Sequence, residues 1–185
     1  MALQRNEISC LIRSAQEGDE RALTKLITIY KGLVFTIIFR MTSDYDVSQE
    51  LTQETFIRVC LNIGRVKSEQ HFRPWMCMIA RNIVRDYFRK AKRNRTISLE
   101  EVGELGGRPH IEMTRRNMII QDALGRLKER DRMLLILTYY QGFSLAEVGE
   151  VMKMSEQNVK VRLHRARKRL RIELRGHEHE VLSAR

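Results

Sequence analysis

The chain has 185 residues and a formal net charge of +11. This length allows one ordinary domain or two small ones, and a composition of 43% hydrophobic and 31% charged residues excludes a chain that is disordered throughout. A strongly basic protein favours a polyanionic partner such as nucleic acid.

The positive charge is concentrated in two segments. Residues 73–95 hold eight Lys or Arg side chains and one acid, and residues 155–175 hold eight against two acids. The rest of the chain is slightly acidic, so the charge marks two candidate surfaces for a polyanion rather than a generally basic protein.

Strand signals are scarce, and apolar residues recur at helical spacing almost everywhere. The stretches "ISCLIRSAQEG" and "ERALTKLITIYKGLVFTIIFRMT" predict two helices with a break at residues 18–19, and a third helix fits residues 46–62. A fourth helix is expected to begin near Pro74, a residue suited to a first helical position, and to continue through "WMCMIARNIVRDYFRKAKR". The predicted fold class is all-α.

Other patterns concern compartment and cofactors. The start "MALQRNEISC" lacks the layout of a signal peptide, and apolar runs such as "GLVFTIIF" are too short to span a bilayer. Cys10, Cys60 and Cys77 form no C-x-x-C pair and indicate reduced thiols. His177 and His179 could bind a metal, although a solvated polar tail is the favoured interpretation. We therefore expect a cytoplasmic protein with no membrane insertion, cofactor or metal site.

The amino-acid composition changes at residues 94–113. This segment holds three of the ten glycines and one of the two prolines, and it has no sustained apolar face. We interpret it as a flexible linker between two small helical domains, residues 1–93 and 114–176, with a tail at 177–185.

The end of the second domain has a helix-turn-helix pattern. In "SLAEVGEVMKMSEQNVKVRLHRARKRL", Ser144 and Glu147 form a capping box, and Ser155 is the next N-cap candidate. Lys153 and Met154 connect the two helices. A short helix, a tight turn and a long basic helix form the layout that places a helix in the DNA major groove.

The long basic helix has one apolar stripe, formed by Val159, Leu163, Ala166 and Leu170. No acid occurs between Val159 and Arg171, whereas a merely solvated helix would mix acids into its polar face. We therefore predict that this helix binds DNA through Gln157, Asn158, Lys160, Val161, Arg162, His164, Arg165 and Lys168. His164 taken singly is also compatible with an ordinary surface residue.

Two helices of the first domain carry further candidates. The segment from Asp44 to Glu54 has four acids and no base, with Leu51, Gln53 and Phe56 among them. This pattern fits either a docking surface or a solvated face with Leu51 and Phe56 in the core. In the following helix an apolar stripe of Phe72, Trp75, Met76, Ile79 and Ile83 is flanked by Arg73, Arg81, Asn82, Arg85 and Arg89. Trp75 is either a core residue, which is favoured, or a platform on which a base stacks.

These segments together resemble a known family. "DVSQELTQETFIRVCLNI" resembles the helix of sigma region 2.2, "HFRPWMCMIARNIVRDYFRKAKR" resembles the helix of regions 2.3–2.4, and the helix-turn-helix segment resembles region 4.2. Two domains and a linker are similar to the extracytoplasmic-function (ECF) group of alternative bacterial sigma factors, over residues 8–95 and 114–175.

The resemblance implies a transcription initiation factor that is not an enzyme. It implies that Asp46, Glu50, Leu51, Gln53, Glu54 and Phe56 bind the β′ clamp coiled coil of core RNA polymerase, with a further contact to the β flap. Promoter DNA would be read at the upstream (−35) element by the DNA-binding residues of the long basic helix. The downstream (−10) element would contact Lys67, Ser68, Arg73, Arg81, Asn82, Arg85 and Arg89, next to the loop "GRVKSEQH" that captures a flipped base. An anti-sigma factor is a further implied partner.

The sequence departs from the family pattern at the second domain's turn. Lys153 or Met154 stands where the family commonly has glycine, and Glu156, Gln157 and Asn158 replace the small residues that usually open the next helix. These changes affect the promoter sequence expected, not the role. The alternative function is a stand-alone helix-turn-helix regulator. An enzyme is not indicated, because the sequence has no phosphate-binding loop, nucleophile with base, or metal cluster.

Overall fold

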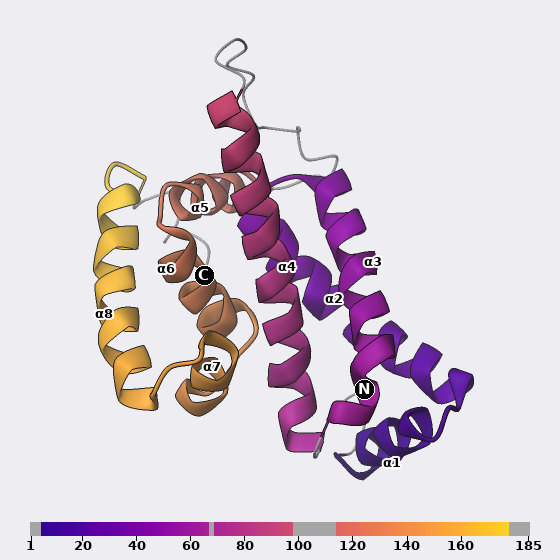
Figure 1. Cartoon of the computed structure of the whole chain (residues 1–185). Coiled ribbons are helices and arrows are strands. Elements are labelled where there is room, and N and C mark those ends of the chain that lie inside the picture. Colours follow the sequence, from indigo (N-terminus) through magenta and orange to yellow (C-terminus); the bar gives the residue numbers. More distant parts are fainter. Residues whose placement is uncertain (1–4, 67–68, 98–113, 178–185) are drawn as a thin grey trace.

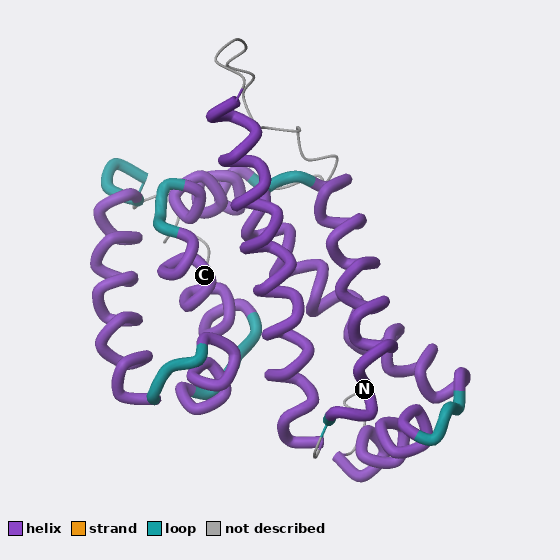
Figure 2. Tube along the Cα trace, in the orientation of Figure 1, coloured by secondary structure: helices purple, strands orange, loops and turns teal. Residues whose placement is uncertain are grey.

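The computed structural model describes residues 5–66, 69–97 and 114–177, and these ranges contain helices and no strand (Figures 1 and 2). The predicted all-α fold is confirmed. The elements are α1 (Arg5–Gln16), α2 (Glu20–Thr42), α3 (Tyr45–Asn62), η1 (Ile63–Arg65), α4 (Glu69–Ile97), α5 (Arg115–Gly125), α6 (Glu129–Leu135), η2 (Ile136–Tyr140), α7 (Leu145–Met152) and α8 (Glu156–Glu173).

The first domain consists of α1 to α4, and side-chain caps determine where its helices begin. The carboxylate of Asp19 accepts hydrogen bonds from the main-chain N–H groups of Arg21 and Ala22 at the start of α2. Ser43 ends α2 in the left-handed conformation, and Asp44 then caps α3. The break and the turn predicted from the sequence are therefore both present, and each is stabilised by a cap.

Helix α2 is long and apolar enough to cross a membrane, by length and composition alone. The sequence-based expectation considered apolar runs such as "GLVFTIIF", whereas the whole helix, Glu20–Thr42, is considerably longer than this run. Seven of its residues are buried in the protein, among them Leu26, Val34, Ile37 and Ile38. Core helices of soluble proteins pass the same test, and the packing of α2 against α1, α3 and α4 is that of a core helix.

Helix α4 begins at Glu69, earlier than predicted, so that Pro74 lies inside the helix. Pro74 lies beyond the first four positions of the helix, whose N–H groups have no helical partner, so it removes one main-chain hydrogen bond near the start of α4. The helix also runs on to Ile97, beyond the start of the predicted linker.

The second domain consists of α5 to α8. Helices α7 and α8 form the predicted helix-turn-helix, with the Ser144–Glu147 capping box on α7 and Ser155 as the N-cap of α8. Gly149 is required at the crossing, because a Cβ atom there would lie 2.7 Å from the carbonyl oxygen of Met154 in the turn. The missing side chain at Gly149 therefore lets the turn before α8 lie close against α7.

The two domains pack against each other through hydrogen bonds made by two buried polar side chains, Gln121 and Arg132. Gln121 of α5 accepts a hydrogen bond from the Arg40 guanidinium (3.0 Å) and donates to the Arg40 carbonyl (3.2 Å) and the Ser43 hydroxyl (2.7 Å). The buried Arg132 of α6 donates to the Met41 carbonyl at 2.5 Å. Figure 1 shows the result, with α5, α6 and α7 lying alongside α4 and the end of α2.

Candidate nucleic-acid and polymerase interface

The outer face of α8 is open to solvent along its length. All eight residues predicted to bind DNA on this helix are exposed: Gln157, Asn158, Lys160, Val161, Arg162, His164, Arg165 and Lys168. The stripe of Val159, Leu163 and Ala166 is buried against the domain. The predicted division of the helix into a packing face and an outer face is confirmed, and Val161 lies on the outer face with 47% of its surface exposed.

An ion pair with a buried carboxylate helps to hold α8 against the rest of its domain. Arg169 donates to the carboxylate of Asp131 on α6, and Asp131 is 5% exposed. A buried carboxylate needs such a partner, because its desolvation is otherwise costly. Arg169 therefore anchors the helix, while the guanidinium groups of Arg162 and Arg165 face solvent.

The basic side of α4 is in part covered by the second domain. Arg73 donates to the Gln141 carbonyl, and its guanidinium carbon lies 4.1 Å from the centroid of the Phe143 ring. Arg81 donates to the Val151 carbonyl at 2.7 Å and to the Asn82 side chain at 3.0 Å. Burial lowers the pKa of Arg81, and the nearby cations Arg85 and Arg130 lower it further.

Further along α4, the remaining candidates stay accessible. Arg85 and Arg89 are mostly exposed and lie 3.8 Å and 3.4 Å from the Asp86 carboxylate. Of the predicted downstream set, Arg73 and Arg81 thus donate hydrogen bonds to the second domain, whereas Arg85 and Arg89 pair with Asp86 of their own helix. Lys67 and Ser68 lie outside the described residues.

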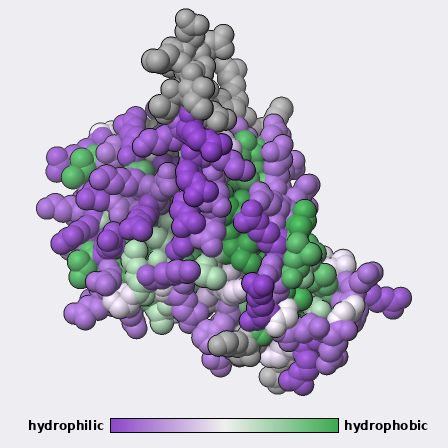
Figure 3. Space-filling model, in the orientation of Figure 1, coloured by the Kyte–Doolittle hydropathy of each residue, from purple (hydrophilic) through white to green (hydrophobic). Residues whose placement is uncertain are grey.

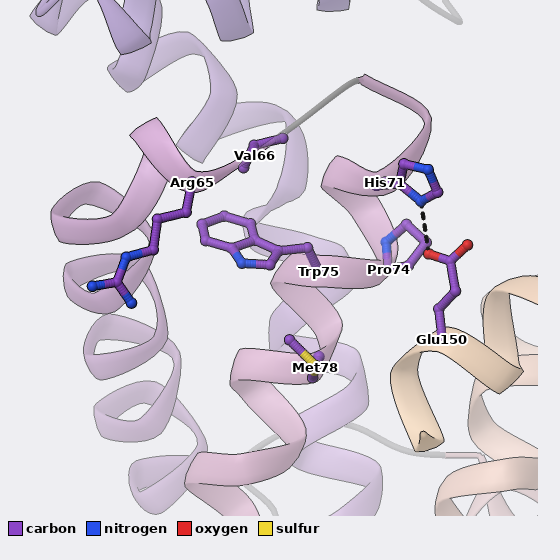
Figure 4. Close-up of a pocket in the computed structure, with 7 residues that line it drawn as sticks. All are labelled: Arg65, Val66, His71, Pro74, Trp75, Met78 and Glu150. Atoms are coloured by element: carbon purple, nitrogen blue, oxygen red, sulfur yellow. Dashed lines mark hydrogen bonds and ion pairs between the residues drawn. The ribbon is translucent and has the colours of Figure 1, made fainter. Parts of the chain in front are cut away.

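A pocket of about 330 Å³ lies at the N-terminal end of α4, next to the loop predicted to capture a base (Figure 4). The indole of Trp75 points into its centre, with Arg65 on one side and Pro74 and His71 on the other. Glu150 of α7 closes the far side through a 3.0 Å contact with His71. Trp75 packs on Phe72 with ring centroids 6.0 Å apart, so it is a core residue on one side and a pocket wall on the other.

The predicted polymerase-binding surface on α3 requires a correction. Leu51 and Phe56 are only 8% and 7% exposed and belong to the core, which removes them from any exposed docking surface. The reason is helical periodicity: both residues lie on the side that packs on α2 and α4. Asp46, Glu50 and Gln53 are exposed. Glu54 is half-buried, and its carboxylate oxygen lies 2.5 Å from the guanidinium nitrogen of Arg58.

The apolar part of this surface is formed by other residues. Ile57 and Leu61 are 60% and 78% exposed and continue the face of Glu50 and Gln53 at helical spacing. In the space-filling view, hydrophobic residues reach the surface near α3, while hydrophilic residues cover α4 and much of the α8 side (Figure 3). We refer to Asp46, Glu50, Gln53, Ile57 and Leu61 as the α3 surface.

The sequence did not single out Ile57, Leu61, Gln121 or Arg132. For the first two, the signal was available, because they fall opposite Leu51 and Phe56 on a helical projection. For Gln121 and Arg132, the partners are main-chain and side-chain groups of α2, so only the packing of the two domains reveals their role. Among the described residues, no group of three or more His, Cys, Asp or Glu side chains could hold a metal, and His179 lies outside them.

Comparisons with known proteins agree with this arrangement. Residues 26–94 match the family model "Sigma-70 region 2", and residues 117–170 match "Sigma-70, region 4". The ECF RNA polymerase sigma factor SigM of Bacillus subtilis is 30% identical over 153 residues, which cover 80% of this chain and 93% of that protein. SigW of the same organism is 28% identical over 177 residues, covering 89% and 95%.

Among solved structures, the sigma factor RpoE in complex with the anti-sigma factor NepR from Bartonella quintana is similar in fold. Its TM-score is 0.70 at 21% identity, over 83% of this chain and 96% of that one. A stand-alone helix-turn-helix regulator is not favoured, because it would not account for the region 2 match. With both regions matched and SigM similar over nearly its whole length, the chain belongs to the ECF RNA polymerase sigma factors.

Proposed function

We propose that the chain binds core RNA polymerase in the cytoplasm and directs initiation at promoters whose −35 element is read by α8 as duplex. Sigma factors are DNA-binding initiation factors and not enzymes. The observation that carries the proposal is the exposed, acid-free outer face of α8. Side chains on the N-terminal half of this face would meet base edges, and the flanking Lys and Arg residues would meet phosphates.

The first domain would melt and hold the −10 element. The pocket at the N-terminal end of α4 has an aromatic wall, Trp75, and polar groups at its rim, which are the features that an unpaired base requires. Arg85 and Arg89 supply positive charge further along the helix for the backbone of the single strand. Arg73 and Arg81 would join them once the second domain moves away.

The α3 surface would bind the β′ clamp coiled coil, while the second domain would meet the β flap. Acidic residues at one end of this surface and Ile57 and Leu61 at the other offer both charge complementarity and apolar area. We also propose control by an anti-sigma factor, because the similar sigma factor RpoE was solved in complex with the anti-sigma factor NepR.

The decisive experiment is promoter-specific transcription with core polymerase and this chain alone. We expect specific transcripts, since a simple regulator would restore none. Ile57→Asp with Leu61→Asp should abolish core binding while duplex binding by α8 stays within twofold. Lys31→Asp, an exposed residue of α2, is the control. Full core binding by the double variant would refute the assignment of the α3 surface.

A further inference from the structure

A second cleft lies on the domain junction, away from the Trp75 pocket. It has a volume of about 310 Å³ and is lined by residues of α2, α4, α6 and the α7–α8 turn. Its apolar lining comes from Met41, Val84, Met133 and Met152, which are all buried. The remaining lining residues are charged, so the cleft combines an apolar, low-dielectric lining with charged side chains.

The charged lining is strongly one-sided. Arg81 and Arg85 come from the first domain, and Arg130 and Lys153 come from the second, against the single carboxylate of Glu129. The four cations and one acid give a net charge of +3. The pKa of Arg81 is lowered by burial and also by Arg85 and Arg130, so the like charges of the two domains act on each other across the cleft.

Lys153 adds an independent observation. It adopts φ 54°, and together with Ser43 it is the only non-glycine residue with positive φ in the described part of the chain. Glycine takes this conformation without strain, whereas a residue with a Cβ does not. Lys153 is the C-cap of α7, and the left-handed conformation of this cap places a cation at a cleft that already repels positive charge.

We propose that this cleft binds a small polyphosphate anion, of the size of the di- or triphosphate group of a nucleotide, and that the bound anion ties the two domains together. A net charge of +3 matches such an anion. Planar guanidinium groups favour phosphate oxygens, because they donate two parallel hydrogen bonds. An apolar floor beneath a rim of one sign concentrates the field on the ligand.

The proposal differs from promoter binding in the residues that it uses. Arg130 and Lys153 belong to none of the promoter-contacting sets, and they face the cleft only when the domains are packed together. A ligand held by both pairs of cations would therefore stabilise the packed arrangement. The same anion would occupy Arg81 and Arg85, which the proposed function assigns to the −10 strand.

The test uses the full chain and sodium tripolyphosphate, with binding measured by isothermal titration calorimetry at 150 mM salt. We expect saturable binding of one anion and a rise in the thermal midpoint. Arg130→Gln with Lys153→Gln should weaken binding at least tenfold. The matched control is Arg13→Gln with Lys31→Gln, which removes the same charge from exposed positions outside the cleft and should stay within twofold.

Lys153→Gly separates a ligand role from a structural one. The variant should have a higher thermal midpoint than the wild type without ligand, because the backbone strain is relieved, and it should bind tripolyphosphate more weakly. ATP and a single-stranded oligonucleotide serve as further probes. Equal binding by the cleft and control variants, or binding of the oligonucleotide alone, would overturn the proposal. Transcription with core polymerase is scored separately, so a failure here leaves the proposed function standing.

Discussion

The two DNA-facing helices differ in how accessible they are. Helix α8 presents its whole outer face to solvent, and the one arginine with a buried partner, Arg169, lies off that face. Helix α4 has two of its arginines, Arg73 and Arg81, bonded to main-chain carbonyl groups of the second domain. The surface proposed to read duplex DNA is exposed, whereas the surface proposed to hold a single strand is partly covered by the second domain.

The difference follows from what each surface would bind. Reading a duplex needs only a rigid helix of the correct shape, and the close approach at Gly149 fixes that shape within one domain. Holding a melted strand needs a groove that must not attract nucleic acid before polymerase is present. We therefore interpret the packed arrangement as one in which the −35 reader is available and the −10 groove is partly closed.

The largest expected effect concerns the residue that joins the domains most deeply. The Arg132 guanidinium donates to the carbonyls of Met41, Gly125 and Leu127. Burial lowers its pKa, and Glu129 opposes that shift. Arg132→Ala leaves these carbonyls without donors and should cost about 3–5 kcal/mol. Urea unfolding checks this, with Arg171→Ala, an exposed residue of α8 outside the junction, as the control, expected within about 0.5 kcal/mol. A cost below about 1 kcal/mol would mean that the junction is not held through Arg132.

The next effect tests the open surface. Arg165 projects from the outer face of α8, and Arg162 lies on its flank. Arg165→Ala should relax preference at one or two positions of the −35 element, since a bidentate contact with guanine is worth about 1–3 kcal/mol of discrimination. Arg162→Ala should instead weaken binding to all sequences alike and reduce the salt slope by about one. A promoter library measured across a salt series distinguishes the two, and the reverse pattern would mean that the helix is rotated from the inferred pose.

The sequence predicted α8 and its faces correctly because the information is local. A 3.6-residue period places Val159, Leu163 and Ala166 on one side, and the caps at Ser144 and Ser155 set the helix starts. On α3 the pattern left two interpretations open, and only the resemblance assigned Leu51 and Phe56 to docking. Their burial supports the other interpretation, in which both residues belong to the core.

The packing between the domains could not be predicted in this way. The bonds from Gln121 to the Arg40 carbonyl and from Arg132 to the Met41 carbonyl join residues far apart in the sequence. Their acceptors are main-chain carbonyls, which leave no mark on the residue types of α2. The predicted start of α4 near Pro74 was also wrong, because the helix begins at Glu69. Proline is common at a first helical position, but it also occurs about one turn further into a helix. Long-range polar contacts and helix ends are where local patterns carry least information.

A smaller effect should sharpen the contrast between the two DNA surfaces. Gln121 is 6% exposed and makes three hydrogen bonds to Arg40 and Ser43. Gln121→Ala should weaken domain packing by about 1–2 kcal/mol and so raise binding of a single-stranded −10 oligonucleotide by about five- to thirtyfold. Duplex binding by α8 should not change. Fluorescence anisotropy measures both, and Asp122→Asn, exposed and next in sequence, is the control. A parallel rise in duplex binding would show that packing covers both surfaces equally.

The smallest effect is expected at the edge of the junction, where His71 lies 3.0 Å from Glu150. Both side chains are about half exposed, so water and salt screen the pair, and such surface pairs contribute about 0–1 kcal/mol. His71→Ala, Glu150→Gln and the double variant form a cycle, read by the same single-strand binding assay. We expect a coupling below about 1 kcal/mol that disappears at 0.5 M salt, whereas the effect of Gln121→Ala should persist because Gln121 is uncharged. A coupling of 2 kcal/mol or more would place the main closure of the −10 groove at the Trp75 pocket rather than at α5 and α6.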